Sequence, residues 1–188
     1  HIPEFLTIMP ETDLRKSGEK QFDYVSPSAR ERQIEMEAAC TEHLRLTGSL
    51  LHPPFETVNL EEGNFPVEAS VIIPVRNRVK TIRDAVASVL RQQTTFAFNL
   101  LVVDNHSTDG TSEILSEYAN KGELQHIIPD RLDLGIGGCW NEALFHPQCG
   151  RFAVQLDSDD LYASETTLQT IINKFREENC AMVIGSYR

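Results

Sequence analysis

Carboxylate side chains gather directly after short apolar runs that have the character of buried strands. One such run is followed by Asp157–Asp160, and another is followed by Asp104. In a parallel α/β sheet, ligands bind beyond the carboxyl ends of the strands, so we expect these side chains to converge. Converging carboxylates repel one another unless a cation or hydrogen-bond donors compensate them. The sequence therefore predicts a polar site at these strand ends.

Asp157 and Asp159 are two residues apart, a spacing that points both side chains to the same side of an extended backbone. Such a pair suits Mg²⁺ or Mn²⁺, which can take one or two carboxylates and fill the remaining positions with water and phosphate oxygens. A metal held there would neutralise a diphosphate and stabilise it as a leaving group. The alternative is a solvated acidic loop in which Ser158 or Asp160 caps the next helix.

Three further segments allow both a functional and a structural interpretation. Asp104–Asp109 could contact a ligand, or it could form an Asx turn with Asp109 as a helix N-cap. Gly135–Gly138 resembles a phosphate loop only in part, because the G-x-G-x-x-G order is missing, and it could serve the backbone conformation alone. Basic residues that could face an anion or lie exposed on a helix follow the first strand: Arg76, Arg78, Lys80 and Arg83.

The apolar pattern predicts the elements that position these residues. Short β-branched runs are typical of buried parallel strands, and apolar residues three and four apart predict helices between them. We expect strands at 71–75, 100–103, 124–128, 152–156 and Ala181–Ile184, with helices at 79–90, 111–120, around Trp140 and Leu144, and at 168–175. Strands alternating with helices predict a doubly wound, mostly parallel α/β sheet.

The first part of the chain has a different character. A capping-box pattern predicts a helix over Ser28–Leu46 that stops at Gly48. Residues 52–66, with their prolines and a glycine, are typical of a linker. We therefore expect an N-terminal extension over residues 1–66 with one helix and a Pro-rich linker, followed by one domain over residues 67–188.

Composition and charge narrow the class of protein. The chain has 188 residues, of which 40% are hydrophobic, and 17 Lys and Arg against 28 Asp and Glu give a net charge of −11. These values indicate a folded domain and exclude a protein that grips nucleic acid through a basic face. No apolar run is long enough to span a bilayer. The 4 cysteines lack the spacing of a zinc site, a redox pair or a disulfide scaffold, which indicates reduced thiols and a cytoplasmic location.

Four segments carry recognisable motifs in a fixed order. Ala69–Asn77 is a strand with a Pro-x-x-Asn turn, and Leu101–Thr111 has the form V-V-D-(D/N)-x-S-x-D-G-T. Asp133–Asn141 is similar to an N-x-G…A-R-N segment, and Leu156–Asp160 contains Asp-x-Asp. Together they resemble the nucleotide-sugar half of a family 2 glycosyltransferase with the GT-A fold. The resemblance covers about Val67 to Arg188.

The resemblance implies a site for a nucleotide-diphosphate sugar. Asp104 and Asn105 would contact the base, Asp157 would hydrogen-bond the ribose, and Asp159 with Asp157 would ligate Mn²⁺ or Mg²⁺ at the diphosphate. The residues that the resemblance assigns to nucleotide-sugar binding are Pro74, Arg76, Asn77, Asp104, Asn105, Asn141, Asp157 and Ser158. Asn105 stands where many members carry a second Asp, and Arg76 stands where an aromatic residue is common, so the identity of the base stays open.

The implied reaction is transfer of a sugar to an acceptor hydroxyl with inversion, in which an Asp or Glu takes the proton. The acceptor would be a glycan or a lipid-linked molecule of polysaccharide biosynthesis. The base of the family lies beyond the position of Arg188, so no catalytic residue is nominated. Because the chain begins with His1 instead of Met, we expect a piece of a longer protein whose full form could associate peripherally with a membrane.

The sequence leaves two alternatives open. The first is a non-catalytic fragment that binds a nucleotide, which the expected absence of the acceptor half favours. The second is a metal-dependent nucleotidyl or phosphoryl transferase, since such enzymes also use aspartates at strand ends. Release of a nucleoside diphosphate from a sugar donor would distinguish the glycosyltransferase from both.

Overall fold

The computed structural model describes residues 30–54 and 56–185 and divides the chain into two compact units, His1–Phe55 and Glu56–Arg188. No helix in the described ranges is long and apolar enough to cross a membrane. In the first unit, α1 spans Arg30–Leu46 and has no buried residue. Gly48 follows it with a φ of +70°, a conformation that favours glycine and ends the helix where the sequence predicts. The predicted start at Ser28 lies outside the described residues.

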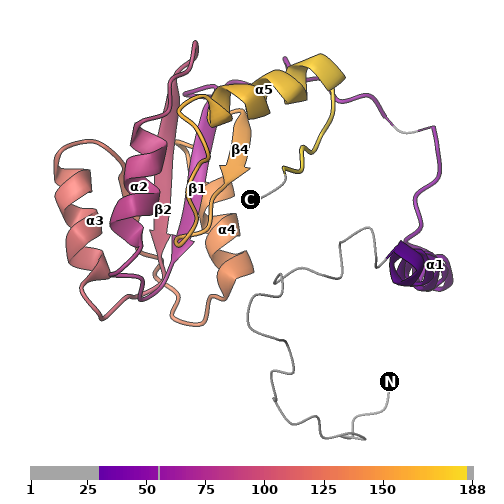
Figure 1. The fold of residues 1–188 in the computed structure, drawn as a ribbon, viewed down its shortest axis with the longest axis horizontal. Coiled ribbons are helices and arrows are strands. Elements are labelled where there is room, and N and C mark those ends of the chain that lie inside the picture. The colour runs from indigo at the N-terminus through magenta and orange to yellow at the C-terminus, as the bar shows by residue number, and fades with distance from the viewer. Residues whose placement is uncertain (1–29, 55, 186–188) are drawn as a thin grey trace, which may run out of the picture. The chain divides into compact units, whose positions relative to one another are not determined.

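The second unit is built on a four-stranded sheet (Figure 1). The strand order is β3-β2-β1-β4, and every neighbouring pair is parallel. The elements follow one another as β1 (Ala69–Val75), α2 (Ile82–Leu90), β2 (Phe98–Asp104), α3 (Thr111–Asn120), β3 (Gln125–Ile127), α4 (Ile136–Leu144), β4 (Phe152–Gln155) and α5 (Thr167–Glu178). This is the predicted parallel α/β architecture, and it places the carboxyl ends of β1 and β2 side by side.

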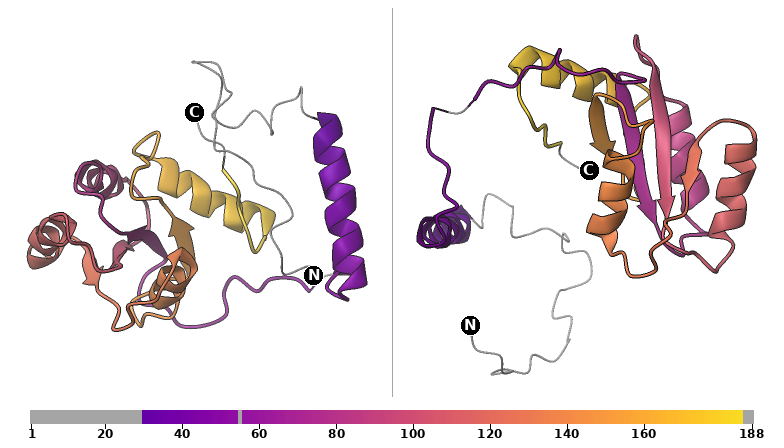
Figure 2. Two further views of the ribbon diagram at one scale, coloured as in Figure 1. Left: turned by 90° about the horizontal axis from the view of Figure 1, so that it is seen from below. Right: turned by 180° about the vertical axis from the view of Figure 1, so that it is seen from behind.

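Helices cover both faces of the sheet (Figures 1 and 2). On one face, alternate residues of β1, among them Val71 and Ile73, pack in one apolar cluster with side chains of α2, α3 and α5. On the other face, Ile72 packs in a second cluster with Cys139 and Ala143 of α4. Because both faces are covered, every residue of β1 is buried, which explains the continuous apolar run Val71–Val75 within it.

The prediction of a fifth strand at Ala181–Ile184 is wrong. Residues 181–185 have no regular secondary structure, and Met182 and Ile184 are 71% and 85% exposed. A strand forms only where a neighbouring strand supplies hydrogen-bond partners, and in the described part of the chain β4 remains an edge of the sheet. A short apolar run is therefore not sufficient evidence for a strand.

The helix after the glycine-rich segment begins earlier in the chain than the sequence predicts. α4 begins at Ile136, so Gly137 and Gly138 lie in its first turn instead of in a preceding turn. Glycine disfavours a helix interior, so packing of the helix must outweigh this preference. Burial of Cys139 and Ala143 against the sheet provides that packing.

The segment before β1 is held by Arg151. Its Nη1 donates to the carbonyl oxygens of Leu60 at 2.6 Å and Glu62 at 2.8 Å. Its guanidinium also lies over the ring of Phe65, 4.9 Å from the ring centroid. These contacts tie the later part of the predicted linker to the sheet unit, and a domain boundary at residue 66 stays a prediction.

Candidate functional site

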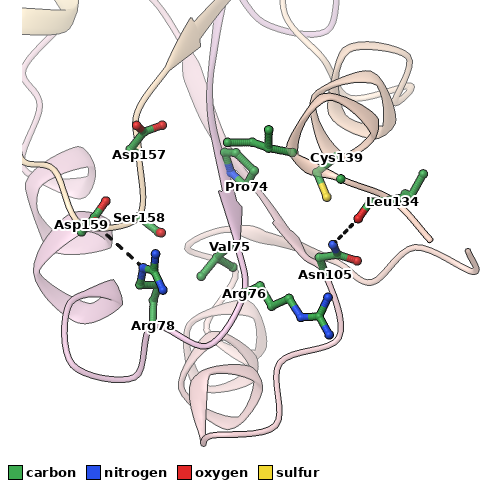
Figure 3. Close-up of a pocket in the computed structure, with 12 residues that line it drawn as sticks. Pro74, Val75, Arg76, Arg78, Asn105, Leu134, Cys139, Asp157, Ser158 and Asp159 are labelled. Atoms are coloured by element: carbon green, nitrogen blue, oxygen red, sulfur yellow. Dashed lines mark hydrogen bonds and ion pairs between the residues drawn. The ribbon is translucent and has the colours of Figure 1, made fainter. Parts of the chain in front are cut away.

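A cavity of about 480 Å³ opens at the carboxyl ends of β1 and β2 (Figure 3). The β1–α2 turn, the start of α4 and the acidic segment after β4 form its walls. Its lining residues are Pro74, Val75, Arg76, Arg78, Asn105, Leu134, Gly135, Ile136, Cys139, Asp157, Ser158 and Asp159. Three strand ends that are far apart in the sequence therefore contribute to one cavity.

Pro74, near the end of β1, and Arg76, directly after it, line the cavity, whereas Asn77 does not. Asn77 has a φ of +55°, a left-handed conformation that asparagine tolerates better than most residues. Its backbone N–H donates to Oγ of Ser107 at 2.9 Å, and its Oδ1 accepts from the backbone N–H of Thr108 at 2.8 Å. Asn77 therefore braces the turn against the loop that follows β2.

Asp104, the last residue of β2, is fully enclosed and does not line the cavity. Its Oδ1 accepts from the backbone N–H of Ser107 at 2.9 Å, while its Oδ2 accepts from Oγ of Ser112 and lies 3.2 Å from Nε2 of His126. Burial alone would raise the pKa of this carboxyl, but the hydrogen bonds from His126, Ser107 and Ser112 outweigh burial and hold the pKa below its usual range. Asp104 thus anchors the loop after β2 in ionised form, and contact with a base stays a prediction.

Asp109 organises the far end of the same loop. Its carboxylate accepts from the backbone N–H of Val79 at 3.1 Å and from the backbone N–H of Thr111 at 3.1 Å and its Oγ1 at 2.6 Å. These hydrogen bonds, led by the one from the Thr111 side chain, lower the pKa of Asp109. Oγ1 of Thr111 in turn accepts from the backbone N–H of Arg78 at 2.9 Å. Asp109 thus has a structural role, because it supports the start of α3 and the turn after β1, but the N-cap of α3 is Gly110 and not Asp109 as predicted.

Asn105 lines the cavity although it is only 7% exposed. Its Nδ2 donates to the carbonyl oxygen of Leu134 at 2.6 Å (Figure 3). Its Oδ1 is buried and has no hydrogen-bond partner among the described residues. The next residue, His106, places Nε2 3.1 Å from the carbonyl oxygen of Arg131. Two side chains after β2 therefore hold the loop that leads into α4.

The acidic segment after β4 forms the opposite wall, with Asp157, Ser158 and Asp159 in the lining. Oγ1 of Thr81, just before α2, donates to the carbonyl oxygen of Ser158 at 2.9 Å. Nε of Arg78 lies 3.8 Å from Oδ2 of Asp159 (Figure 3). The turn after β1 thus contacts the acidic segment through one hydrogen bond and one ion pair.

The charge in this segment is suited to a cation. Asp160, beside the cavity lining, has a raised pKa because of its burial and then because of the neighbouring carboxylates of Asp157 and Asp159. Within the described ranges, no group of three or more His, Cys, Asp or Glu side chains is arranged to hold a metal. Asp157 and Asp159 nevertheless provide two carboxylates on one wall, as many as Mg²⁺ or Mn²⁺ needs when phosphate and water supply the other ligands.

The structure places Asn141 outside the cavity. It lies in a separate depression of about 290 Å³ with Glu142, Phe145, His146 and Pro147. Asn141 is two residues beyond the cavity-lining Cys139, and two helical residues turn a side chain by about 200°. A role of Asn141 in nucleotide-sugar binding stays a prediction that this placement does not favour.

Sequence reasoning did not identify the wall formed by Leu134, Ile136 and Cys139. In a parallel α/β sheet each helix begins just beyond the carboxyl end of the preceding strand, and ligands bind at this edge of the sheet. The place of these residues before α4 and in its first turn therefore predicts that they lie near the ligand site. Their residue types, which are mostly apolar, do not indicate a binding role. The sequence marks Arg78 only as one of several basic residues after β1, because its place beside Asp159 depends on the fold of the turn.

The parallel sheet and its strand-end cavity define an α/β domain of the GT-A type. Residues 70–188 match the family model of glycosyl transferase family 2, so the chain belongs to this family. TuaG of Bacillus subtilis (strain 168), provisionally named a teichuronic acid biosynthesis glycosyltransferase, is 34% identical over 124 residues. Poly(ribitol-phosphate) beta-N-acetylglucosaminyltransferase TarS of Staphylococcus aureus (strain Mu50) is 36% identical over 98 residues.

Solved structures of TarS have the same fold in the matched region. The crystal structure of S. aureus TarS 1-349 in complex with UDP is 33% identical, with a TM-score of 0.51, and the match covers 58% of this chain and 32% of that one. The sequence matches cover 66% of this chain and 48% of TuaG, and 52% of this chain and 17% of TarS. The chain thus spans about half the length of TuaG.

Proposed function

We propose that the sheet unit binds a nucleotide-diphosphate sugar and is the donor half of an inverting glycosyltransferase that uses Mn²⁺ or Mg²⁺. The observation that carries this proposal is the composition of the cavity. It combines the carboxylates of Asp157 and Asp159 with the guanidinium groups of Arg76 and Arg78 and the amide of Asn105. Guanidinium groups suit phosphates, carboxylates suit ribose hydroxyls and a divalent cation, and an amide suits a base. A nucleotide-diphosphate sugar carries all of these groups in one molecule.

Asp157 and Asp159 are the residues that would hold the cation. Their position on one wall supports this assignment, because it brings together negative charge that a cation would offset. A bound cation supplies electrostatic stabilisation of the leaving diphosphate. Arg78, 3.8 Å from Asp159, adds a second positive charge at the same place.

The other residues of the cavity would orient the donor for displacement. Pro74 and Arg76 would form the wall at the base and ribose, and Asp157 would accept hydrogen bonds from the ribose hydroxyls. Arg78 would contact the diphosphate. An acceptor hydroxyl would then attack the anomeric carbon opposite the diphosphate, which inverts that carbon in a single displacement. The group that takes the proton of the hydroxyl is not assigned among these residues.

The relatives support a class of donor and acceptor. TarS has been crystallised with UDP and with UDP-GlcNAc, so we propose a uridine diphosphate sugar as the donor. The names of TuaG and TarS concern teichuronic acid and poly(ribitol-phosphate). We propose on this basis that the acceptor is a glycan or a lipid-linked precursor of a polysaccharide.

Calorimetric titration tests the proposal directly. The chain is titrated with uridine, thymidine and guanosine diphosphates in Mn²⁺ and then in EDTA. We expect UDP to bind and EDTA to weaken its binding by about tenfold or more. Asp159→Asn should weaken binding in Mn²⁺ to the value measured in EDTA. Glu123→Gln, the same change at an exposed residue that does not line the cavity, should bind like the wild type.

The experiment also separates the alternatives. If none of the three nucleotides binds, or if EDTA and Asp159→Asn have no effect, the proposed donor site is wrong. Release of UDP from UDP-GlcNAc with an added acceptor indicates a transferase. Binding without any release in the longest available form of the protein indicates a nucleotide-binding module.

A further inference from the structure

The ion pair between Arg78 and Asp159 crosses from the turn after β1 to the acidic segment after β4. Nε of Arg78 lies 3.8 Å from Oδ2 of Asp159, and the two side chains are 49% and 55% exposed. An ion pair in contact with water is weak, because water screens both charges. A stronger partner for either group can therefore replace this contact.

Hydrogen bonds fix the backbone on both sides of this ion pair. The backbone N–H of Arg78 donates to Oγ1 of Thr111 at 2.9 Å. Oγ1 of Thr81 donates to the carbonyl oxygen of Ser158, the residue before Asp159, at 2.9 Å. Arg78 can thus change its partner by rotation of its side chain, while the turn and the acidic segment keep their places.

The two carboxylates of the cavity have partners of different charge. Oδ1 of Asp157 accepts a hydrogen bond from Nε2 of Gln155, a neutral amide, at 3.1 Å. Asp159 instead faces the guanidinium of Arg78, which is always charged (Figure 3). A carboxylate that accepts from a neutral donor remains a good ligand for a divalent cation, whereas a guanidinium opposes a second positive charge beside it. Arg78 and a divalent cation therefore compete for Asp159.

Arg78 also lines the cavity itself. A guanidinium binds phosphate oxygens through parallel N–H donors, and such charge-assisted pairs are stronger than an exposed ion pair at 3.8 Å. The cavity thus offers Arg78 two anionic partners in turn, the carboxylate of Asp159 before a nucleotide binds and the diphosphate afterwards.

We propose that Arg78 occupies the place of the divalent cation at Asp159 in the free protein and transfers to the diphosphate when the nucleotide sugar binds. This proposal rests on the proposed nucleotide-sugar site and adds a coupling between its two ligands. Arg78 lowers the affinity for the cation while the nucleotide is absent and stops doing so once the diphosphate holds the guanidinium. Each ligand therefore strengthens the binding of the other, and the coupling is reciprocal.

The affinity for Mn²⁺ without a nucleotide tests the proposal, with free Mn²⁺ measured by electron paramagnetic resonance. Arg78→Met keeps the length of the side chain and removes the competing charge, so we expect it to bind Mn²⁺ about threefold to tenfold more tightly than the wild type. Calorimetry at saturating Mn²⁺ should show the opposite effect on UDP, which binds less tightly because a phosphate contact is lost. Loss of a phosphate contact alone would leave the affinity for Mn²⁺ unchanged.

Two comparisons assign the effect to this ion pair. Lys80→Met makes the same change of charge at an exposed residue of the same turn that does not line the cavity, and it should change the affinity for Mn²⁺ by less than about twofold. In a chain that already carries Asp159→Asn, Arg78→Met should no longer raise the affinity for Mn²⁺, because the competition has no object. Thermal unfolding verifies that each variant is folded.

The outcomes separate this proposal from the proposed function. If the wild type binds no UDP in Mn²⁺, the proposed donor site fails. If it binds UDP but Arg78→Met gains no affinity for Mn²⁺ alone, only the exchange is overturned, and this includes the case in which neither protein binds Mn²⁺ without UDP. An equal gain in Lys80→Met also overturns the exchange. A gain in Arg78→Met that is absent from Lys80→Met and from the Asp159→Asn background supports it.

Discussion

Nε2 of His126 in β3 lies 3.2 Å from Oδ2 of Asp104, the enclosed last residue of β2. The same carboxylate accepts the backbone N–H of Ser107 at 2.9 Å through Oδ1 and the hydroxyl of Ser112 through Oδ2. One buried charge therefore joins two strands, a loop and the first turn of α3. Asn105, which lines the cavity, is the next residue in the chain, so its position depends on this carboxylate.

The ionisation of Asp104 predicts how stability depends on pH. Burial would raise its pKa, but the hydrogen bonds outweigh burial and the pKa lies below the ordinary 3.8. A carboxyl whose pKa is lower in the folded state stabilises the fold fully above the unfolded pKa and loses this contribution as pH falls through the folded one. We expect the free energy of unfolding to fall from about pH 5 downward, and less steeply in Asp104→Asn.

Asp104→Asn should also be less stable than the wild type at pH 7, by about 2 kcal/mol, since charge-assisted hydrogen bonds to a buried group are lost. Urea denaturation at several pH values measures both effects. Ser112→Ala removes one of the donors and should show a smaller loss at pH 7. Identical pH slopes in the wild type and Asp104→Asn would refute the assignment of this charge.

Gln92 predicts a second stability effect, at the loop between β4 and α5. Its Nε2 donates to the carbonyl oxygen of Ser164 at 2.7 Å, and its Oε1 accepts from the backbone N–H of Leu168 at 2.8 Å. Gln92 is buried, so Gln92→Leu leaves backbone groups unpaired and should cost about 1–3 kcal/mol of unfolding free energy.

Gln93 provides the matched control for this prediction. Its side chain is exposed and donates to Oε2 of Glu165, so Gln93→Leu should change the unfolding free energy by about 0.5 kcal/mol or less. Chemical denaturation of both variants gives the comparison. Equal effects at the two positions would show that the loop does not depend on the buried amide.

The sequence was sufficient to predict the sheet but not the chemistry of each strand end. The apolar run of β1 and the alternation of strands and helices predict a parallel sheet, since only strands covered on both faces are apolar throughout. Parallel strands end at one edge, so the convergence of Pro74, Asn105 and Asp157 followed from topology. The run at Ala181–Ile184 shows the limit, because hydrophobicity does not report whether a partner strand is available.

Which polar side chains face the cavity could not be predicted from residue type. Asp104 and Asn105 are adjacent, yet the carboxylate is enclosed by hydrogen bonds and the amide lines the cavity. Successive residues of a strand point to opposite sides, and the side is set by register and by partners such as His126 that are distant in sequence. On α4, the rotation of about 100° per helical residue separates Cys139 from Asn141 in the same way.

Arg78 predicts an effect on ligand binding. It lines the cavity 3.8 Å from Asp159, so it should contact the diphosphate and weaken UDP binding by about fivefold to tenfold when changed to Met. Lys80→Met, a charge loss at an exposed residue of the same turn that does not line the cavity, is the control. Calorimetry at two salt concentrations checks the result. Equal losses in both variants would indicate a general effect of net charge instead.

Gly150 predicts a steric effect on the strand that leads to the acidic segment. A Cβ at this position would lie 2.8 Å from the backbone carbon of Ala69 and 3.0 Å from the backbone nitrogen of Ser70. The backbone N–H of Gly150 also donates to Oγ of Ser70 at 2.7 Å. Gly150→Ala should therefore push the start of β4 away from β1 and lower the unfolding free energy by about 1–3 kcal/mol.

Gly137 in α4 is the matched control for this last prediction. A Cβ there would meet no atom within 4 Å, and alanine favours a helix over glycine, so Gly137→Ala should stabilise the protein by about 0.5–1 kcal/mol. Thermal and urea unfolding of both variants measure the change in unfolding free energy, which should be negative for Gly150→Ala and positive for Gly137→Ala. If Gly150→Ala were as stable as the wild type, β4 could shift freely against β1, and the acidic segment would not be held at a fixed place across the cavity from Asn105.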